Sequence, residues 1–163
     1  MRRLLVFFSF LFFIGCATKG INIYIPVESN IKNENIVVID QRKNKNIIGY
    51  IYKRGEIVED ITFSTDLDRY FLSKLSKIDK NVQIYIKNLF LKYDKSKLTG
   101  ENIEGKLVIK MEFIKNGQKV VRVINIQESR WIGPINYAKE IEKFTKKILD
   151  EGVKHIYKIL KER

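Results

Sequence analysis

The chain has 163 residues, a net charge of +12, one cysteine and one histidine. With a single residue of each kind it cannot build a structural zinc site from Cys and His ligands, and no disulfide can form within the chain. A hydrophobic fraction of 45%, with 12% aromatic residues, is sufficient for a buried core, and this length predicts one folded domain. The composition therefore disfavours metal-site enzymes and thiol enzymes most strongly.

The first fifteen residues have the pattern of a secretory signal peptide. Arg2 and Arg3 form a short positive segment, and an apolar run follows over residues 4–14, interrupted only by Ser9. A membrane-spanning helix needs about 20 apolar residues to cross a hydrocarbon core about 30 Å thick, so this run is too short to span a bilayer. We therefore expect residues 1–15 to direct export and to be removed.

Cys16 follows the apolar run directly, in the segment Phe13-Ile14-Gly15-Cys16, which resembles a bacterial lipobox. The resemblance implies that the thiol of Cys16 carries a diacylglycerol group and that Cys16 becomes the acylated first residue of the mature protein. Several acyl chains, at about 0.8 kcal/mol per buried methylene, anchor a protein stably to a membrane. Ala17, rather than Asp, follows the cysteine, and by resemblance to proteobacterial sorting rules this favours the periplasmic leaflet of the outer membrane.

The positive charge has two possible explanations. Loss of Arg2 and Arg3 with the signal peptide would leave a net charge of +10. Because export excludes nucleic acid as a plausible partner, such a charge would suit anionic lipid, lipopolysaccharide or acidic parts of envelope proteins. The alternative is compositional: Ile, Lys and Asn are abundant, and Ala17 and Ala138 are the only alanines, which is the bias of an AT-rich genome. The sequence leaves both explanations open.

The first half of the mature chain predicts a tether, three strands and a helix. Residues 16–35 are polar around Pro26, so we expect the lipidated Cys16 and a tether there, followed by one domain over residues 36–163. Strands are expected near residues 36–39, 47–52 and 57–63. The next segment predicts an amphipathic helix, with Thr65 and Asp68 resembling a capping box at its start. Its apolar residues recur at spacings of three and four: Leu67, Tyr70, Phe71, Leu75 and Ile78.

The second half predicts a long hairpin and a second helix. A strand is expected from Val82 to Tyr93, with a bulge near Lys87-Asn88 where the alternation of apolar residues changes phase. Asn116-Gly117 separates two alternating runs, which predicts a two-residue type I′ turn. The predicted register pairs Phe113 with Val120, Met111 with Arg122, Ile109 with Ile124, and Leu107 with Ile126. A final helix is expected to follow Asn136. These elements predict a two-layer α+β domain, with a mainly antiparallel sheet and two amphipathic helices on one face.

Four further residues are candidates for interaction with a partner. Asp40 and Arg42 stand at the end of a predicted strand, where they either are displayed by a functional loop or form a capped turn with a local ion pair. Arg130 and Trp131 either form a ligand-binding edge or provide an aromatic cover for the end of the sheet. The sequence contains no Gly-rich phosphate loop, nucleophile elbow or zinc-binding His pair. We therefore expect a non-enzymatic protein without a metal or cofactor.

The order of elements and several short motifs resemble the YajG family of bacterial lipoproteins. The features that carry the resemblance are the lipobox at Cys16, the strand Ile36-Val37-Val38-Ile39 ending in Asp40-Gln41-Arg42, the following Ile48-Gly49, and Asp66-Leu67 at the start of the first helix. The resemblance implies an outer-membrane lipoprotein with an α+β domain and no catalytic residues. The architecture is also similar to LptE-like lipoproteins of lipopolysaccharide assembly and to auxiliary lipoproteins of lipid-transporting ABC systems.

From these patterns we expect a periplasmic lipoprotein anchored in the outer membrane. Its expected role is that of a non-enzymatic accessory or scaffold, presenting its domain to a protein partner of the cell envelope. The alternative is a lipid or lipopolysaccharide binder that uses its basic surface and the space between the helices and the sheet.

Overall fold

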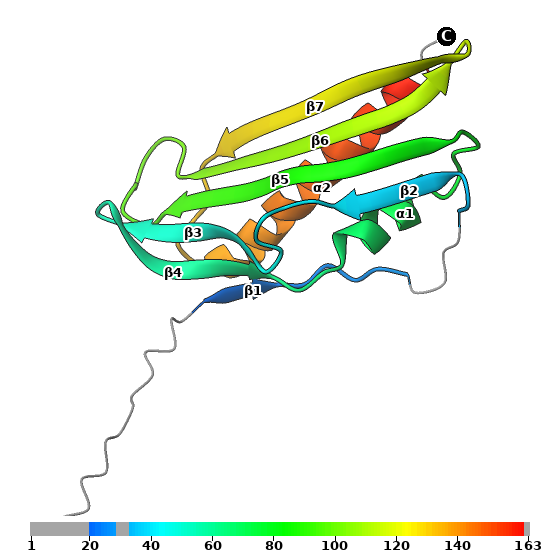
Figure 1. Cartoon of the computed structure of the whole chain (residues 1–163). Coiled ribbons are helices and arrows are strands. Elements are labelled where there is room, and N and C mark those ends of the chain that lie inside the picture. Colours follow the sequence, from blue (N-terminus) through cyan, green and yellow to red (C-terminus); the bar gives the residue numbers. More distant parts are fainter. Residues whose placement is uncertain (1–19, 29–32, 162–163) are drawn as a thin grey trace, which may run out of the picture.

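The structure is a computed structural model that describes residues 20–28 and 33–161 (Figure 1). The expected signal peptide and Cys16 lie outside the described residues. Two helices and seven strands follow one another in the described part: β1 (Ile21–Ile23), β2 (Ile36–Asp40), β3 (Ile47–Lys53), β4 (Glu56–Phe63), α1 (Leu67–Leu75), β5 (Val82–Asp94), β6 (Ile103–Lys115), β7 (Gln118–Arg130) and α2 (Tyr137–Lys161).

β5 is the central strand of the sheet, because it pairs with three other strands. On one edge it pairs with β2 along Val82–Ile86 and with β3 along Leu91–Asp94, both in parallel. On its other edge it pairs with the antiparallel β6, which in turn pairs with β7. β4 joins β3 in antiparallel orientation, and β1 joins β4 in parallel orientation at the far end of the sheet. The expected α+β class is confirmed, with a mixed sheet whose longest pairings are antiparallel.

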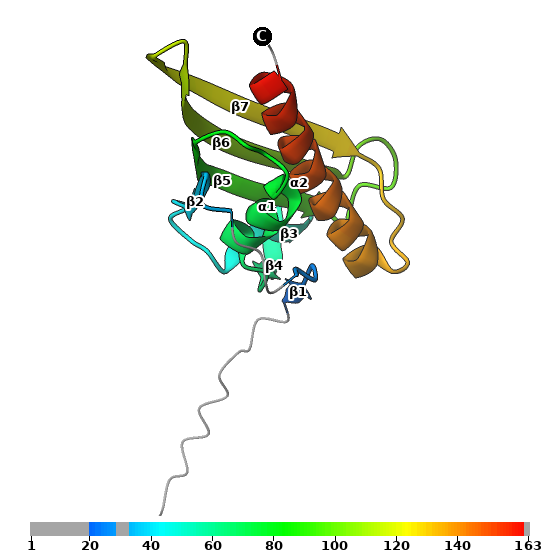
Figure 2. The ribbon, with the colours of Figure 1, turned by 90° about the vertical axis from the view of Figure 1, so that its right-hand side faces the viewer.

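Both helices cover the same face of the sheet, as Figure 2 shows from the side. Each helix presents one apolar stripe to the strands: Tyr70 and Phe71 are buried in α1, and Phe144 and Ile148 in α2. The strands supply alternating apolar residues to the same layer, so the hydrophobic core lies between the sheet and the helices. The opposite face of the sheet carries no helix among the described residues, and we call it the outer face.

The predicted hairpin is confirmed in turn type and in register. Asn116 and Gly117 have φ values of 52° and 77°, as a type I′ turn requires. The four predicted pairs between β6 and β7 are all present. The predicted bulge in β5 is present as well, as a shift of register against β6 between Ile86 and Asn88.

The expected tether over residues 16–35 is wrong at residues 21–25, which belong to the folded domain. β1 pairs with β4, and Ile23 and Ile25 are almost fully buried. The backbone N–H of Ile25 donates to Thr65 Oγ1 at 2.6 Å, and this hydroxyl donates back to Ile25 O at 3.1 Å. Because Ile21, Ile23 and Ile25 alternate with polar or aromatic residues, they fit a half-buried strand that covers the edge of β4. The folded domain therefore begins before residue 36.

The predicted capping box is also wrong. Asp66 is the N-cap of α1, and its carboxylate accepts a hydrogen bond from the backbone N–H of Arg69. Thr65 is unavailable for capping because its hydroxyl is bonded to Ile25. A tertiary contact has therefore displaced the cap by one residue from the position that the local pattern favours.

At Gly49, β3 lies too close to β5 to admit a side chain. A Cβ atom at this position would lie 2.0 Å from the carbonyl oxygen of Leu91. We expect Gly49→Ala to lower the free energy of unfolding by about 3 kcal/mol or more, because the clash is with backbone and cannot be relieved by a rotamer change. Urea unfolding followed by circular dichroism measures this loss.

Gly133→Ala is the matched control, since a Cβ there would meet only the ring of Trp131 at an ordinary 3.6 Å. An unfolding midpoint for Gly49→Ala equal to that of Gly133→Ala would contradict the assigned approach of the two strands.

Candidate functional site

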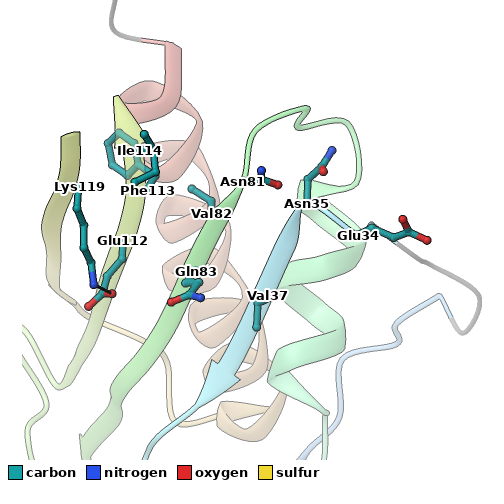
Figure 3. Close-up of a pocket in the computed structure, with 10 residues that line it drawn as sticks. All are labelled: Glu34, Asn35, Val37, Asn81, Val82, Gln83, Glu112, Phe113, Ile114 and Lys119. Carbon is teal, nitrogen blue, oxygen red and sulfur yellow. Dashed lines mark ion pairs between the residues drawn. The ribbon is translucent and has the colours of Figure 1, made fainter. Parts of the chain in front are cut away.

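The outer face contains a groove of about 370 Å³ near the tip of the β6–β7 hairpin (Figure 3). The segment before β2, the start of β5, and both strands of the hairpin build its walls. Its apolar lining consists of Val37, Val82, Phe113 and Ile114, and its polar lining consists of Glu34, Asn35, Asn81, Gln83, Glu112 and Lys119. The groove lies where the start of β2 pairs with the first residues of β5.

Glu112 is the most strongly perturbed carboxylate along this groove. Its Oε2 lies 2.7 Å from Nζ of Lys119 on β7, and its Oε1 lies 2.5 Å from Nζ of Lys110. The hydrogen bonds and charges of these two lysines lower the pKa of Glu112 to about 2. Because two ammonium groups face one carboxylate, the wall formed by the hairpin is positive at neutral pH.

The opposite wall of the groove presents side-chain amides that are held by local hydrogen bonds. Asn33 donates to the carbonyl oxygens of Ser76 and Ile78, both at 3.1 Å, and so ties the segment before β2 to the end of α1. Asn35 donates to Asp79 at 3.1 Å, and its own carbonyl oxygen accepts from the N–H of Val82. The groove thus combines apolar contact area with amide and ammonium groups.

Sequence reasoning missed this groove. Glu112 and Lys119 were placed on the same side of the hairpin by the predicted register, so their proximity was available from the sequence. The position of β2 beside the start of β5 was not available, because a parallel pairing between distant strands leaves no local pattern.

Asp40 and Arg42 form a buried ion pair at the end of β2. Their side chains are only 7% and 4% exposed. Arg42 donates from Nε and Nη2 to the carboxylate of Asp40 at 2.9 and 2.8 Å, and from Nη2 to Lys45 O at 3.0 Å. The expectation that these residues are displayed to a partner is therefore wrong, and the alternative of a turn closed by a local ion pair is confirmed.

The ion pair lies at the end of β2, where the chain leaves the edge of β5. The chain returns to the same edge further along, at β3. β2 ends opposite Ile86, and β3 begins its pairing at Leu91. The guanidinium of Arg42 lies 6.0 Å from the ring centre of Phe63. Although burial alone would raise the pKa of Asp40, the hydrogen bonds and charge of Arg42 hold it below its ordinary value.

Asp68 lies in the first turn of α1, near this ion pair. Its Oδ1 and the Nη1 of Arg42 are buried without a hydrogen-bond partner among the described residues. Burial raises the pKa of Asp68, and the nearby carboxylates of Asp66 and Asp40 raise it further. The ionised form of Asp68 therefore lowers the stability of the fold. The favourable interaction of its negative charge with the N-terminus of α1 offsets only part of this loss.

Arg130 and Trp131 lie at the other end of the sheet, where β7 finishes. Arg130 donates to Glu140 O at 3.2 Å, and its guanidinium lies 5.2 Å from the ring centre of Phe144. Trp131 is 51% exposed, so about half of its surface is open to solvent at the end of the sheet. Ile132 is the buried residue of this segment, and Asn102 holds it by hydrogen bonds of 2.7 and 2.8 Å to its N–H and carbonyl oxygen.

The two pairs of predicted interaction residues do not form one site. Asp40 lies beside Ile86 of β5, whereas Arg130 lies beside Ile103, which pairs with Tyr93 of β5. From Ile86 to Tyr93 the strand advances about 24 Å at about 3.4 Å per residue. Of the four residues, Trp131 is the most exposed to a partner.

Two features are absent from the described residues. Among them, no group of three or more His, Cys, Asp or Glu side chains is placed to hold a metal ion. Neither α1 nor α2 is long and apolar enough to cross a membrane.

Comparison with known proteins shows similarity at the level of structure. No protein-family model matches the chain, and no curated protein matches its sequence. A solved structure described as "Crystal structure of uncharacterized protein" is similar over 86% of this chain and 99% of that chain, with a TM-score of 0.47 and 9% sequence identity. This similarity carries no information on function.

We expect Arg42→Ala to lower the free energy of unfolding by about 3–5 kcal/mol, because it leaves the buried carboxylate of Asp40 without its partner. The pKa of Asp40 is lowered by folding, so the contribution of the pair is present above about pH 4 and is lost as the pH falls through the folded-state pKa. Urea titrations at pH 7 and pH 3 measure both effects.

The matched control is Arg69→Ala, which removes a pair with Asp66 whose side chains are 67% and 52% exposed. Such a pair contributes under about 1 kcal/mol. Equal losses in the two variants at pH 7 would show that the pair of Arg42 and Asp40 is not buried in solution.

Proposed function

We propose that this protein is an exported lipoprotein, anchored through Cys16, that serves as a non-catalytic accessory of the cell envelope and presents the outer face of its sheet to a protein partner. The outer membrane, on its periplasmic side, is the proposed location, and the resemblance to the YajG family belongs to the same proposal. The observation that carries it is the segment from Arg2 to Cys16, in which the only cysteine of the chain follows a short apolar run and a glycine.

The outer face supports the choice of a protein partner. It carries exposed apolar side chains on four strands, which we call the outer patch: Val37 and Ile39 on β2, Phe90 on β5, Ile114 on β6, and Val121 and Val123 on β7. Exposed apolar side chains on an uncovered face support a role in protein interaction. By register, Gln83 and Glu112 lie between Val37 and Val121, so polar side chains alternate with the apolar ones across the face. The groove at the hairpin interrupts this patch and adds polar groups that can give specificity.

The layer between the helices and the sheet favours a protein partner over the lipid-binding alternative. Phe144, Ile148 and Leu149 of α2 are fully buried against the strands. A Cβ atom added at Gly105 of β6 would lie 2.2 Å from Cδ1 of Ile148, so side chains fill this part of the layer. A lipid chain entering there would have to displace packed core residues.

We expect Cys16→Ser to abolish incorporation of labelled palmitate and to leave the precursor uncleaved, because the serine hydroxyl does not accept the diacylglycerol group. Gel mobility and fractionation of the membranes after expression of the full chain provide the measurement. Ala17→Ser, which keeps the thiol, is the control and should be labelled as the unchanged chain is. Palmitate labelling of Cys16→Ser at the level of this control would refute the proposed anchor.

A photo-crosslinking residue placed at Val37 should capture one envelope protein reproducibly in intact cells, since this position lies in both the groove and the outer patch. The control position is Leu98, which is equally apolar and 80% exposed but lies in the loop between β5 and β6. We expect at least tenfold more product at Val37. Adducts of lipid alone at Val37, or equal capture at both positions, would contradict the proposed partner.

A further inference from the structure

β7 ends the sheet and has an open edge. It is 13 residues long, and in the described part of the chain it pairs with β6 alone. Figure 1 shows it as the upper border of the sheet, with no strand beyond it. A long strand in this position presents a row of unpaired backbone donors and acceptors to solvent.

The hairpin geometry identifies the backbone groups that face outward. In a hairpin with a two-residue turn, the residues that flank the turn exchange hydrogen bonds, and here they are Lys115 and Gln118. Even-numbered residues of β7 therefore direct their N–H and C=O groups toward β6, and odd-numbered residues direct theirs to the open edge. One contact agrees with this assignment: Arg122 Nη1 donates to Val121 O at 3.4 Å.

The middle of this edge is apolar. Val121 and Val123 are 44% and 65% exposed, and both belong to the odd-numbered set whose backbone groups are open. The charged residue between them, Arg122, projects from the helix-covered side of the strand, beside Ile124. A β-branched edge of this kind favours addition of another strand.

We propose that two copies of this chain pair through β7 as antiparallel strands, with the two-fold axis at Asn125. Asn125 then faces Asn125 of the second copy. Ile124 faces Ile126 of the second copy, and Arg122 faces its Glu128. Because the interface is isologous, each of these last two contacts occurs twice. The dimer joins the two sheets into one.

Charge complementarity selects this register among the neighbouring ones. With the axis at Arg122, this residue would face Arg122 of the second copy. With the axis at Val123, Arg122 would face Ile124 of the second copy. An axis at Ile126 would bring Arg122 opposite Arg130. Only the axis at Asn125 places an acid opposite Arg122, and even-numbered residues form the closer, non-hydrogen-bonded pairs, in which side chains interact most directly.

The contacts within one copy are compatible with this pairing. Glu128 already accepts from Lys147 of α2 at 2.6 Å, and its side chain remains accessible on the helix side of the strand. Arg122 would exchange its long contact with Val121 O for Glu128 of the second copy, which frees that carbonyl to accept from the backbone of the opposite strand. The overlap of residues 120–130 provides about ten backbone hydrogen bonds.

Dimerisation would also extend the proposed partner surface. The outer faces of the two copies lie on the same side of the joined sheet and form one continuous surface. Trp131 of the second copy comes level with Lys119 at the rim of the groove. The pairing itself does not depend on the anchor or on the identity of a partner, and so it goes beyond the proposed function.

The first test is crosslinking of Asn125→Cys in the full chain with a bis-maleimide that spans about 8 Å. Directly opposed residues lie about 5.5 Å apart in this type of pair, so the two thiols are within reach. The matched control is Lys119→Cys, on the same face of the same strand. In the proposed register, the two copies of residue 119 are about 40 Å apart. The unchanged chain gives the background from Cys16.

We expect at least ten times more crosslinked dimer from Asn125→Cys than from Lys119→Cys. Equal yields at the two positions, or a yield at Asn125→Cys no higher than that of the unchanged chain, would overturn the proposal.

The second test reverses the charges in the Asn125→Cys chain. Arg122→Glu alone, or Glu128→Arg alone, should lower the crosslinked fraction at least fivefold, because like charges then face each other. The double variant with both changes should restore it. Circular dichroism of each variant separates loss of pairing from loss of fold. Folded single variants with unchanged yield, or a folded double variant that stays as low as the single ones, would refute the register.

Discussion

The pairing of β5 with three strands is the constraint on which the rest of the domain depends. β6 occupies one whole edge of β5, while β2 and β3 share the other edge one after the other. A chain that leaves this edge of β5 and returns to it further along must cross an interval where this edge has no strand partner. The residues that cross this interval are therefore under unusual packing and hydrogen-bonding demands.

Two short motifs meet these demands. Asp40 and Arg42 close the exit from β2 by a buried ion pair that also ties down Lys45 O. Gly49 allows β3 to pair with β5 where the chain returns to this edge, because any side chain at this position would collide with Leu91 O. These are the same residues that suggested the resemblance to the YajG family, and the fold gives each of them a structural role. A motif of this kind maintains the architecture of a domain, and the residues that carry the function lie on other surfaces.

The surfaces that remain for function are the outer face and the edge of β7. Because both helices cover one face, the other presents the outer patch, the groove and the ammonium groups around Glu112. The apolar edge of β7 adjoins the same patch at Val121 and Val123. A partner bound to the outer face and a second copy bound at the edge would occupy adjoining surfaces without competing for the core-facing side chains.

The sequence alone determined the elements that rest on local patterns. The turn at Asn116-Gly117, the register of the β6–β7 hairpin, the bulge in β5 and the two amphipathic helices follow from periods of two or 3.6 residues and from backbone preferences, so they were predicted correctly. The sequence by itself also motivates the anchor at Cys16, which lies outside the described residues. Tertiary structure decided the rest. Four features arise from contacts between segments that are distant in the chain. They are the pairing of Ile21–Ile23 with β4, the shift of the helix cap to Asp66, the burial of Asp40 with Arg42, and the groove. Such contacts depend on which strand edges are left open, and no local spacing of residues encodes that.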